Sequence, residues 1–367
     1  MKARSLFFGL LTCAAAAANA ADGSAHSGVI DRYGLEESAA PVRERAEWRK
    51  PKRILIGGMA AQAAPRIAAM APDVEFVTAQ SAADAASKAK NVDAVIGVCT
   101  PEIVQAGKSI RWIQLTSAGV EQCVRIPGVR ERGILVTNMQ RIGGPVIAEH
   151  VIAMTLAFTR GLDLYIPAQA KREWRRATPP GRMAVVEGKT MLVVGLGGIG
   201  SEVARRAHAL GMRVTATRAS GRTGPDYVSY VGLPDELHKL AAEADFVVNT
   251  APLTPQTTGI FDAAFFAKMK PTAYFINVAR GGSVTTSALV DALNQGKIAG
   301  AALDVTEPEP LPPEHPLWSA RNVIITPHVA NDSDLGFDAQ LAVVAENLRR
   351  YAAGDRMLSV VDVERGY

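Results

Sequence analysis

The chain has 367 residues, of which 48% are hydrophobic and 21% are charged, so it is long enough for two domains of ordinary size with a substantial core. Its formal net charge of +4 is small for this length, and the lysines and arginines are scattered apart from short clusters at 43–53 and 171–176. This distribution excludes the basic surface that nucleic-acid binding needs, so no nucleic-acid partner is expected.

The first 20 residues have the form of a secretory signal peptide. Lys2 and Arg4 precede an apolar run at 6–18, and Ala18-Asn19-Ala20 fits a cleavage site of small residues. The run is too short to be a stable membrane anchor, so no stable membrane insertion is expected. The sequence therefore predicts a periplasmic or secreted protein. A cytoplasmic location is the alternative if the signal is not used. After cleavage, Cys99 and Cys123 would be the remaining cysteines, enough for one bridge but not for a disulfide framework.

Residues 21–51 are polar and are predicted to be an extended leader. From residue 53 onward, short apolar runs of strand type alternate with alanine-rich stretches of helical character. This alternation predicts a parallel sheet covered by helices. The strand-type runs are 53–57, 74–77, 94–98, 112–115 and 135–136, and the helical stretches include 60–70 and 82–90.

A long helix is predicted over residues 145–160. Pro145 suits the first turn of a helix, and Gly161 suits the position just past its end. A second series of strands and helices follows, and a further helix is expected at 332–353. Six strands with intervening helices suit a complete dinucleotide-binding domain. The six predicted strands are 191–195, 213–217, 246–250, 274–278, 299–305 and 323–326.

The most informative motif is Gly-Leu-Gly-Gly-Ile-Gly at 195–200, between the first strand of this series and a predicted helix. In such a turn Gly195 permits the sharp bend, Gly197 lets the backbone approach a pyrophosphate, and Gly200 lets helix and strand pack closely. The N-terminus of the helix then offers free N–H groups to the phosphates. The motif therefore predicts a dinucleotide-binding site.

Charged residues follow several of the later strands. They are Arg218, Arg280, Asp304, Glu309 and His328. In a doubly wound sheet, ligands bind beyond the carboxyl ends of the strands. These side chains are therefore expected to gather on one rim, beside the phosphate-binding turn. Each has an ordinary structural interpretation on its own, but their joint placement favours an active site.

An ordered set of motifs resembles the D-isomer-specific 2-hydroxyacid dehydrogenases, most closely the glyoxylate/hydroxypyruvate reductase branch. The resemblance runs from about residue 53 to the C-terminus. It implies an α/β protein in which a Rossmann dinucleotide domain, 145–328, is inserted into a flavodoxin-like, doubly wound substrate domain formed by 52–144 and 329–367. It also implies a homodimer built through residues 145–180. The motifs are TSAGVEQ (116–122), GLGGIG (195–200), PLTPQT (252–257), NVARGG (277–282), AALDVTEPEPLP (301–312) and TPHVA (326–330).

The resemblance implies a role for three catalytic residues. Arg280 would hold the substrate carboxylate and polarise the C2 carbonyl, because its planar, permanently charged guanidinium matches a carboxylate. His328 would exchange a proton with the carbonyl oxygen, since its unperturbed pKa lies near working pH. Glu309 would hydrogen-bond His328 and favour its charged form, with Glu307 as the rival for this role.

The resemblance also implies two binding regions and no metal site. Ser117, Ala118 and Gly119 would bind the substrate carboxylate through the backbone, together with Arg280. Asp304 would contact the nicotinamide amide. The residues implied to bind the cofactor are Gly195, Gly197, Gly198, Ile199, Gly200, Arg218, Ser220, Arg222, Pro252, Thr257, Val278, Ala279, Asp304 and Ala330.

The cofactor preference depends on the residue that follows the second strand of the dinucleotide domain. An acidic residue there binds the ribose 2′-hydroxyl of NAD, but this chain has Arg218, with Ser220 and Arg222 close behind. Arginine can pair with a 2′-phosphate. The sequence therefore predicts that NADP(H) is preferred, with NAD(H) as the alternative. An exported chain fits this prediction poorly, because NADPH is regenerated in the cytosol.

The implied reaction is hydride transfer from NAD(P)H to the C2 carbonyl of a small 2-oxo acid such as glyoxylate or hydroxypyruvate, giving the D-2-hydroxy acid. Two alternatives stay open. One is a reductase of the D-lactate type or for bulkier 2-oxo acids, and the other is a dinucleotide-sensing protein without catalysis. One departure concerns the substrate pocket, because Asn331 stands where the family usually has glycine. Asn tolerates left-handed backbone, so the turn is expected to form.

Overall fold

The computed structural model describes residues 28–176, 178, 182–334 and 336–367, and the predicted signal peptide at 1–20 lies outside the described residues. The described residues form two compact units, one that runs up to Ile142 and includes the C-terminal segment from Asp334, and one within Gly143–Ser333. The inserted unit is thus slightly longer at both ends than the predicted 145–328. At its C-terminal end, the carboxylate of Asp304 accepts hydrogen bonds from the backbone N–H groups of Val329 and Ala330.

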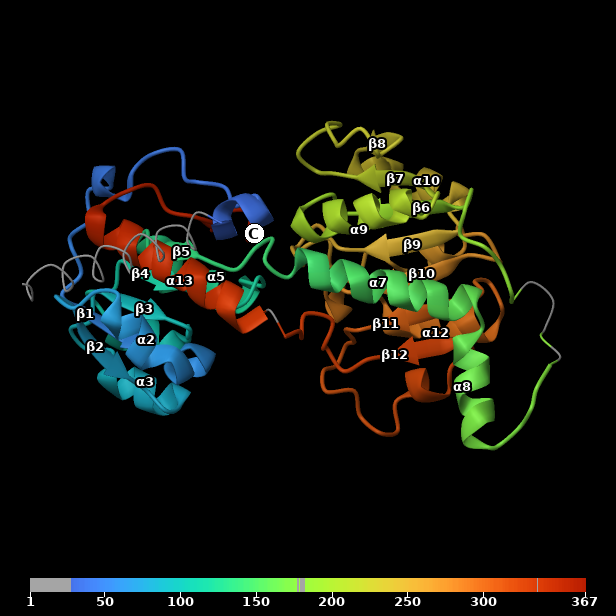
Figure 1. The fold of residues 1–367 in the computed structure, drawn as a ribbon, viewed down its shortest axis with the longest axis horizontal. Helices are drawn as coiled ribbons and strands as arrows, with labels where there is room; N and C mark the ends of the chain where they lie inside the picture. Colours follow the sequence, from blue (N-terminus) through green and yellow to red (C-terminus); the bar gives the residue numbers. More distant parts are fainter. Residues whose placement is uncertain (1–27, 177, 179–181, 335) are drawn as a thin grey trace, which may run out of the picture. The chain divides into compact units, whose positions relative to one another are not determined.

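The first unit contains a five-stranded parallel sheet in the order β2-β1-β3-β4-β5 (Figure 1). All five strands lie where the apolar runs predict them. The order is the flavodoxin-like one, and it reverses direction between β1 and β3. The strands are β1 (Arg53–Ile56), β2 (Glu75–Thr78), β3 (Ala94–Ile96), β4 (Trp112–Gln114) and β5 (Leu135–Thr137).

Helices cover both faces of this sheet. Because side chains alternate along a strand, Ile54 and Ile56 pack on one face with residues of α2 and α13, whereas Leu55 packs on the other with residues of α3, α4 and α6. The helical segments are η2 (Gly58–Ala63), α2 (Ala64–Ala69), α3 (Ala82–Lys88), α4 (Pro101–Ala106), α5 (Glu121–Val124), α6 (Pro127–Glu131) and α13 (Gly336–Ala353).

The prediction of an extended leader at 21–51 is wrong for its described part. Residues 28–33 are helical, η1 (Val42–Glu44) follows, and the side chains of Val29, Leu35 and Val42 are buried in the core of the first unit. The indole N–H of Trp48 donates a hydrogen bond to a backbone carbonyl of α13 at 3.0 Å. A few widely spaced apolar side chains are enough to attach this polar segment to the unit.

The second unit contains a seven-stranded parallel sheet in the order β12-β11-β10-β9-β6-β7-β8. The six predicted strands are confirmed, and β8 is an additional edge strand. The order reverses between β6 and β9, as in a Rossmann dinucleotide-binding sheet. The strands are β6 (Thr190–Val194), β7 (Arg213–Thr217), β8 (Tyr230–Gly232), β9 (Phe246–Asn249), β10 (Tyr274–Asn277), β11 (Gly300–Leu303) and β12 (Val323–Ile325).

Two helical layers cover this second sheet. Met191 and Val193 face a layer formed by α7 and α9, which lie side by side in Figure 1. Leu192 and Val194 face the opposite layer, formed by α10, α11 and α12. The helical segments are α7 (Gly144–Thr159), α8 (Leu162–Ala170), α9 (Gly198–Ala209), η3 (Pro234–Glu236), α10 (Leu237–Glu243), α11 (Ala263–Phe266), η4 (Gly281–Ser283), α12 (Thr286–Asn294) and η5 (Pro316–Ser319).

Within the described part of the chain, no single helix has the length and hydropathy needed to cross a membrane. The pair α7 and α8 meets those criteria only when both helices are counted together, and the chain bends by 75° between them.

Candidate active site

The glycine turn after β6 has the shape that a pyrophosphate needs. Gly195 adopts a left-handed φ of 95°, and a Cβ there would lie 2.7 Å from the Cα atom of Ala251. A Cβ on Gly200 would lie 2.2 Å from the carbonyl oxygen of Gly195, whereas one on Gly197 would meet nothing within 4 Å. Gly195 and Gly200 therefore allow close backbone packing, and Gly197 borders open space. The turn fits a dinucleotide.

The helix that follows this turn supports the same conclusion. Helix α9 begins at Gly198 with Gly197 as its N-cap, and no side chain caps its first turn. The backbone N–H groups at a helix N-terminus carry partial positive charge and bind phosphate oxygens. The predicted cofactor residues from Gly195 to Gly200 thus lie in one turn at the N-terminus of α9, and their binding of phosphate stays a prediction.

The segment after β7 holds the residues predicted to select the cofactor. Arg218 directly follows β7 and is partly exposed, and its guanidinium donates a hydrogen bond to the carbonyl of Thr223 at 3.0 Å. Arg222 instead forms an ion pair with Glu236 at 2.7 Å. The hydrogen bond that Glu236 accepts from Tyr230, followed by those from the backbone of residue 233 and from Arg222, holds the pKa of Glu236 at about 2. The lowered pKa keeps Glu236 anionic, as its ion pair with Arg222 requires.

The loops after β9 and β10 are joined by a buried amide network that the sequence did not predict. The side chain of Asn249 donates hydrogen bonds to the amide oxygen of Asn277 at 3.0 Å and to the hydroxyl of Ser283 at 2.8 Å. Asn277 and Ser283 in turn donate to the backbone carbonyl of Arg280, at 3.0 and 2.7 Å. All three polar residues are buried. They fix the backbone of the residue predicted to hold the substrate.

Arg280 itself lies at the end of β10, just before η4. Its side chain is partly buried, and one guanidinium nitrogen donates to the carbonyl of Ala279 at 2.7 Å. Val278 and Ala279, both predicted to line the cofactor site, are buried beside it. In the neighbouring loop the predicted residues Pro252 and Thr257 are joined by a hydrogen bond of 2.6 Å.

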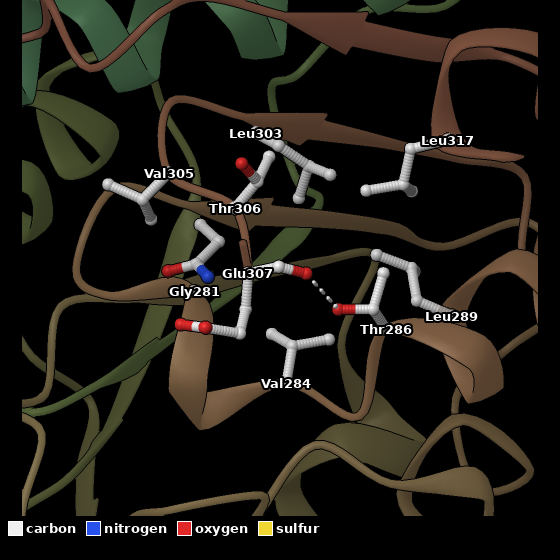
Figure 2. Close-up of a pocket in the computed structure, with 10 residues that line it drawn as sticks. Gly281, Val284, Thr286, Leu289, Leu303, Val305, Thr306, Glu307 and Leu317 are labelled. Atoms are coloured by element: carbon white, nitrogen blue, oxygen red, sulfur yellow. Dashed lines mark hydrogen bonds between the residues drawn. The ribbon is translucent and has the colours of Figure 1, made fainter. Parts of the chain in front are cut away.

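Close backbone packing holds the Arg280 turn against the segment after β11. A Cβ added to Gly281 would lie 1.9 Å from the carbonyl oxygen of Thr306. Figure 2 shows the small cavity beside this contact, and the hydroxyl of Thr286 bonded to the carbonyl of Glu307. The cavity holds about 10 Å³, enough for one water molecule and too small for a substrate. Gly281 therefore sets the distance between the two segments.

We predict that Gly281→Ala lowers the free energy of unfolding by about 1–3 kcal/mol, as overpacking does, and also lowers kcat/KM. The methyl group must push the Arg280 turn away from the 306–309 segment. Urea unfolding and steady-state kinetics measure the two effects. Gly282→Ala is the matched control, because its Cβ would meet only the ends of flexible side chains, Leu253 at 3.2 Å and Glu307 at 3.8 Å. Equal, small effects of both variants would contradict the prediction.

The expected pairing of Glu309 with His328 is confirmed. The Nδ1 atom of His328 lies 3.0 Å from a carboxylate oxygen of Glu309, and the other oxygen of Glu309 accepts a hydrogen bond from the backbone N–H of Thr306. Glu307, the rival, uses its backbone carbonyl to accept from Thr286. The His328 and Glu309 side chains are 52% and 38% exposed, so they can reach a ligand. The contact uses Nδ1 of the imidazole, and proton exchange through Nε2 stays a prediction.

Asp304 anchors the turn that carries His328. Its carboxylate is 2% exposed and accepts hydrogen bonds from the Thr326 hydroxyl at 2.6 Å and from the backbone N–H groups of Val329 and Ala330 at 3.0 Å. The carbonyl of Asp304 also accepts from the backbone N–H of His328. The predicted contact between Asp304 and the nicotinamide amide stays a prediction.

Two further features of this turn differ from what the sequence indicates. The left-handed residue is His328, with φ of 57°, and Asn331 does not have a positive φ. In addition, His150 on α7 lies 3.1 Å from the Thr326 hydroxyl, so α7 contributes to the network that holds the turn. A histidine inside the otherwise apolar α7 indicates a polar contact, but its partner Thr326 is 176 residues away in the sequence.

Continuous contacts join the predicted groups of the second unit along the carboxyl edge of its sheet. The Thr250 hydroxyl bonds the carbonyl of Gly195, linking the phosphate turn to the β9 loop. The amide network then links β9 to the Arg280 turn, and that turn packs on the segment bearing Glu309. An arginine, an acid–base pair and a dinucleotide turn therefore share one edge of one sheet.

The predicted carboxylate-binding segment lies in the first unit, after β4. Ser117 and Ala118 are exposed. The carbonyl of Ser117 accepts from the backbone N–H of Met139 at 3.1 Å, the Ser117 hydroxyl donates to the carbonyl of Gly119, and Asn138 donates to the carbonyl of Ala118. These hydrogen bonds hold the segment at the carboxyl edge of the first unit's sheet.

Comparisons with known proteins agree with this geometry. Residues 152–330 match the family model for the NAD binding domain of the D-isomer specific 2-hydroxyacid dehydrogenases. The chain is 32% identical to a glyoxylate/hydroxypyruvate reductase A of Photorhabdus laumondii over 286 residues, which cover 76% of this chain and 88% of that protein. It is 33% identical to a glyoxylate reductase of Korarchaeum cryptofilum, covering 76% of this chain and 85% of that one.

A solved structure shows the same likeness. The NADPH-dependent glyoxylate/hydroxypyruvate reductase of Sinorhizobium meliloti, in complex with NADP and sulfate, superposes with a TM-score of 0.74 at 28% identity, covering 86% of this chain and all of that one. The chain belongs to the D-isomer-specific 2-hydroxyacid dehydrogenase family. It is therefore an NAD(P)-dependent oxidoreductase with a Rossmann domain.

Proposed function

We propose that this protein reduces a small 2-oxo acid of the glyoxylate or hydroxypyruvate type to the D-2-hydroxy acid and prefers NADP(H). The observation that carries the proposal is the contact between His328 and Glu309, on the same sheet edge as Arg280 and the phosphate turn. A protein that only sensed dinucleotides would need no proton-exchanging pair. The relatives named above support the substrate class.

Each side chain then has a defined task. Arg280 holds the carboxylate of the 2-oxo acid and polarises its C2 carbonyl, because a guanidinium offers a charged, planar pair of donors. His328 donates the proton that the carbonyl oxygen takes up, and Glu309 orients the imidazole through its contact with Nδ1. The bound nicotinamide supplies the hydride. The turn at 195–200 would hold the cofactor's pyrophosphate.

Loss of NADPH absorbance tests the reaction on purified protein. Glyoxylate, hydroxypyruvate, pyruvate and a bulky aromatic 2-oxo acid should be compared at matched concentrations. We expect the highest kcat/KM with glyoxylate or hydroxypyruvate. A preference for the bulky acid would point to the alternative reductase, and nucleotide binding without turnover across the panel would contradict the proposal in favour of a sensing function.

The cofactor preference gives a sharper prediction. Arg218→Ala should lower kcat/KM with NADPH by about 10–100-fold, because charge-assisted hydrogen bonds to a 2′-phosphate are worth about 1.5–3 kcal/mol. The value of kcat/KM with NADH should change little. Arg222→Ala is the matched control, since its guanidinium is already paired with Glu236, and we expect a smaller loss. A wild-type enzyme that prefers NADH would contradict the assignment of Arg218.

We also propose that the protein is a homodimer that uses the region from α8 to residue 185. Ile166 is 61% exposed and Trp174 is 92% exposed, and Leu162, Met183 and Val185 are exposed as well. Several large apolar side chains within one short region are typical of an interaction surface. Light scattering with the purified protein should give the mass of two chains. A monomer that persists at high protein concentration would contradict this proposal.

For the location of the protein, we propose export. Two observations support it: the signal-type N-terminus, and a disulfide between Cys99 and Cys123 in the first unit. Disulfides persist in oxidising compartments and are rare in the cytosol. Cell fractionation with N-terminal sequencing tests the proposal. A mature chain beginning after Ala20 outside the cytosol is expected, and a cytosolic chain that retains Met1 would contradict it.

A further inference from the structure

The disulfide joins two loops at the carboxyl edge of the first unit's sheet. Cys99 lies in the loop between β3 and α4, and Cys123 lies in α5, directly after the 115–120 segment that follows β4. Their Cα atoms are 5.5 Å apart, and the bridge spans 24 residues of sequence. Because β3 and β4 are parallel neighbours, both loops leave the sheet on the same side.

The Cys99 end of the bridge is attached to a rigid part of this edge. A Cβ on Gly58 would lie 2.6 Å from the carbonyl oxygen of Gly97, and one on Gly97 would lie 2.3 Å from the carbonyl oxygen of Gly57. Two loops that approach this closely leave each other little room to move. The loop that carries Cys99 is thus held by the loop after β1.

The Cys123 end is attached to a short helix that directly follows an exposed turn: Val120 and Cys123 are buried, whereas Ser117 and Ala118 are exposed. Helix α5 has only four residues, and its N-cap Val120 makes no side-chain cap. A helix of one turn is not stable by itself. The exposed residues Ser117 and Ala118 precede it and are held by the few hydrogen bonds described above. The disulfide links α5 covalently to the loop that follows β3.

We propose that the Cys99–Cys123 disulfide positions the carboxylate-binding segment 117–119, so that the enzyme reaches its full affinity for the 2-oxo acid only with the bridge closed. This inference rests on the proposed function. The bridge acts through α5 and the backbone of 117–119, and neither sulfur touches the substrate. Cys123 is buried but Cys99 is partly exposed, so a reductant can reach the bond from that side.

Opening the bridge needs a reductant, and a small dithiol supplies it. One thiolate of the dithiol attacks a sulfur of the bridge, which forms a mixed disulfide and releases the other cysteine. The second thiol of the dithiol then attacks the mixed disulfide and releases the remaining cysteine. Two electrons and two protons pass to the protein, so both cysteines become thiols and the dithiol becomes a cyclic disulfide. Air or an oxidised dithiol reverses the reaction.

The first test compares oxidised and dithiol-treated wild-type enzyme, with thiol titration to show that reduction is complete. On reduction we expect the KM for glyoxylate to rise about tenfold, equivalent to about 1.4 kcal/mol of affinity. kcat should fall less, the Kd for NADPH should hardly change, and reoxidation should restore KM. The Cys99→Ser/Cys123→Ser double variant should resemble the reduced enzyme and show no response to dithiol. An unchanged KM after complete reduction would overturn the proposal.

A second measurement does not depend on activity. Amide hydrogen exchange in peptides covering 116–122 should become faster on reduction, while exchange in the 195–209 segment of the other unit serves as the internal control. Unchanged exchange at 116–122 would overturn the positioning role even if the double variant fails to fold. If the oxidised enzyme reduces no 2-oxo acid but this exchange still responds, the proposed function fails and the effect of the bridge on the loop stands.

Discussion

Replacing His328 with alanine is expected to lower kcat by about 10²–10⁴-fold, the range that a positioned general acid contributes. The variant keeps the phosphate turn and Arg280, so the Kd for NADPH should hardly change. The reason is the proposed division of tasks along the sheet edge: His328 would exchange a proton with the carbonyl through Nε2, whereas the glycine turn after β6 would hold the cofactor. Steady-state kinetics and a nucleotide titration measure the two quantities.

The control for this variant is His208→Ala, which removes an exposed histidine from the last turn of α9. It should keep nearly full activity. A loss of NADPH affinity in His328→Ala that matches its loss of turnover would mean that His328 supports the fold of the site rather than the proton transfer. Its left-handed backbone makes this comparison necessary, because a residue at that position also shapes the turn.

Arg280→Ala is expected to lower kcat/KM by about 10²–10³-fold, as removal of one donor to a developing oxyanion costs about 2.7–4 kcal/mol. In contrast to His328→Ala, the loss should include a clear rise in KM for the 2-oxo acid, because the proposed role of Arg280 includes holding the carboxylate. Arg280→Lys keeps the charge but not the planar pair of donors. It should recover only part of the activity.

The same kinetic assay with both substitutions separates the two contributions of Arg280. If Arg280→Lys has full activity, the positive charge alone is sufficient for binding and catalysis, and the paired donors of the guanidinium are not needed. If Arg280→Ala leaves both KM and kcat unchanged, Arg280 is not the residue that binds the substrate. Circular dichroism must show that the variants fold, because the backbone of Arg280 is part of the buried Asn249–Asn277 network.

The strands and the phosphate turn could be predicted because their signals are local. A buried parallel strand appears in the sequence as a continuous apolar run, and the glycine motif occupies six consecutive residues. The edge strand β8 lacks such a signal, since it has three residues and ends in Gly232. The leader was misread for a similar reason: Val29, Leu35 and Val42 are too widely spaced to form an apolar run, yet each one is buried.

The parts of the site that sequence reasoning missed depend on distant partners. Asn249 and Asn277 end two neighbouring strands and lie opposite each other in the β9–β10 register. An asparagine at the end of an apolar run was a visible signal, but its partner follows only from the strand order. Asp304 is predicted to contact the nicotinamide amide, and that prediction stays untested. Its burial and its bonds to the 326–330 turn could be seen only once β11 and β12 were adjacent.

The transfer of an isotopic label tests the central claim most directly. NADPH carrying deuterium in place of both hydrogens at C4 of the nicotinamide should be incubated with the purified oxidised enzyme and glyoxylate, and the product examined by mass spectrometry. We predict glycolate with one deuterium at C2, and no such product with His328→Ala on the same time scale. Tight NADPH binding without deuterium in any 2-hydroxy acid, across the panel of 2-oxo acids, would contradict the account.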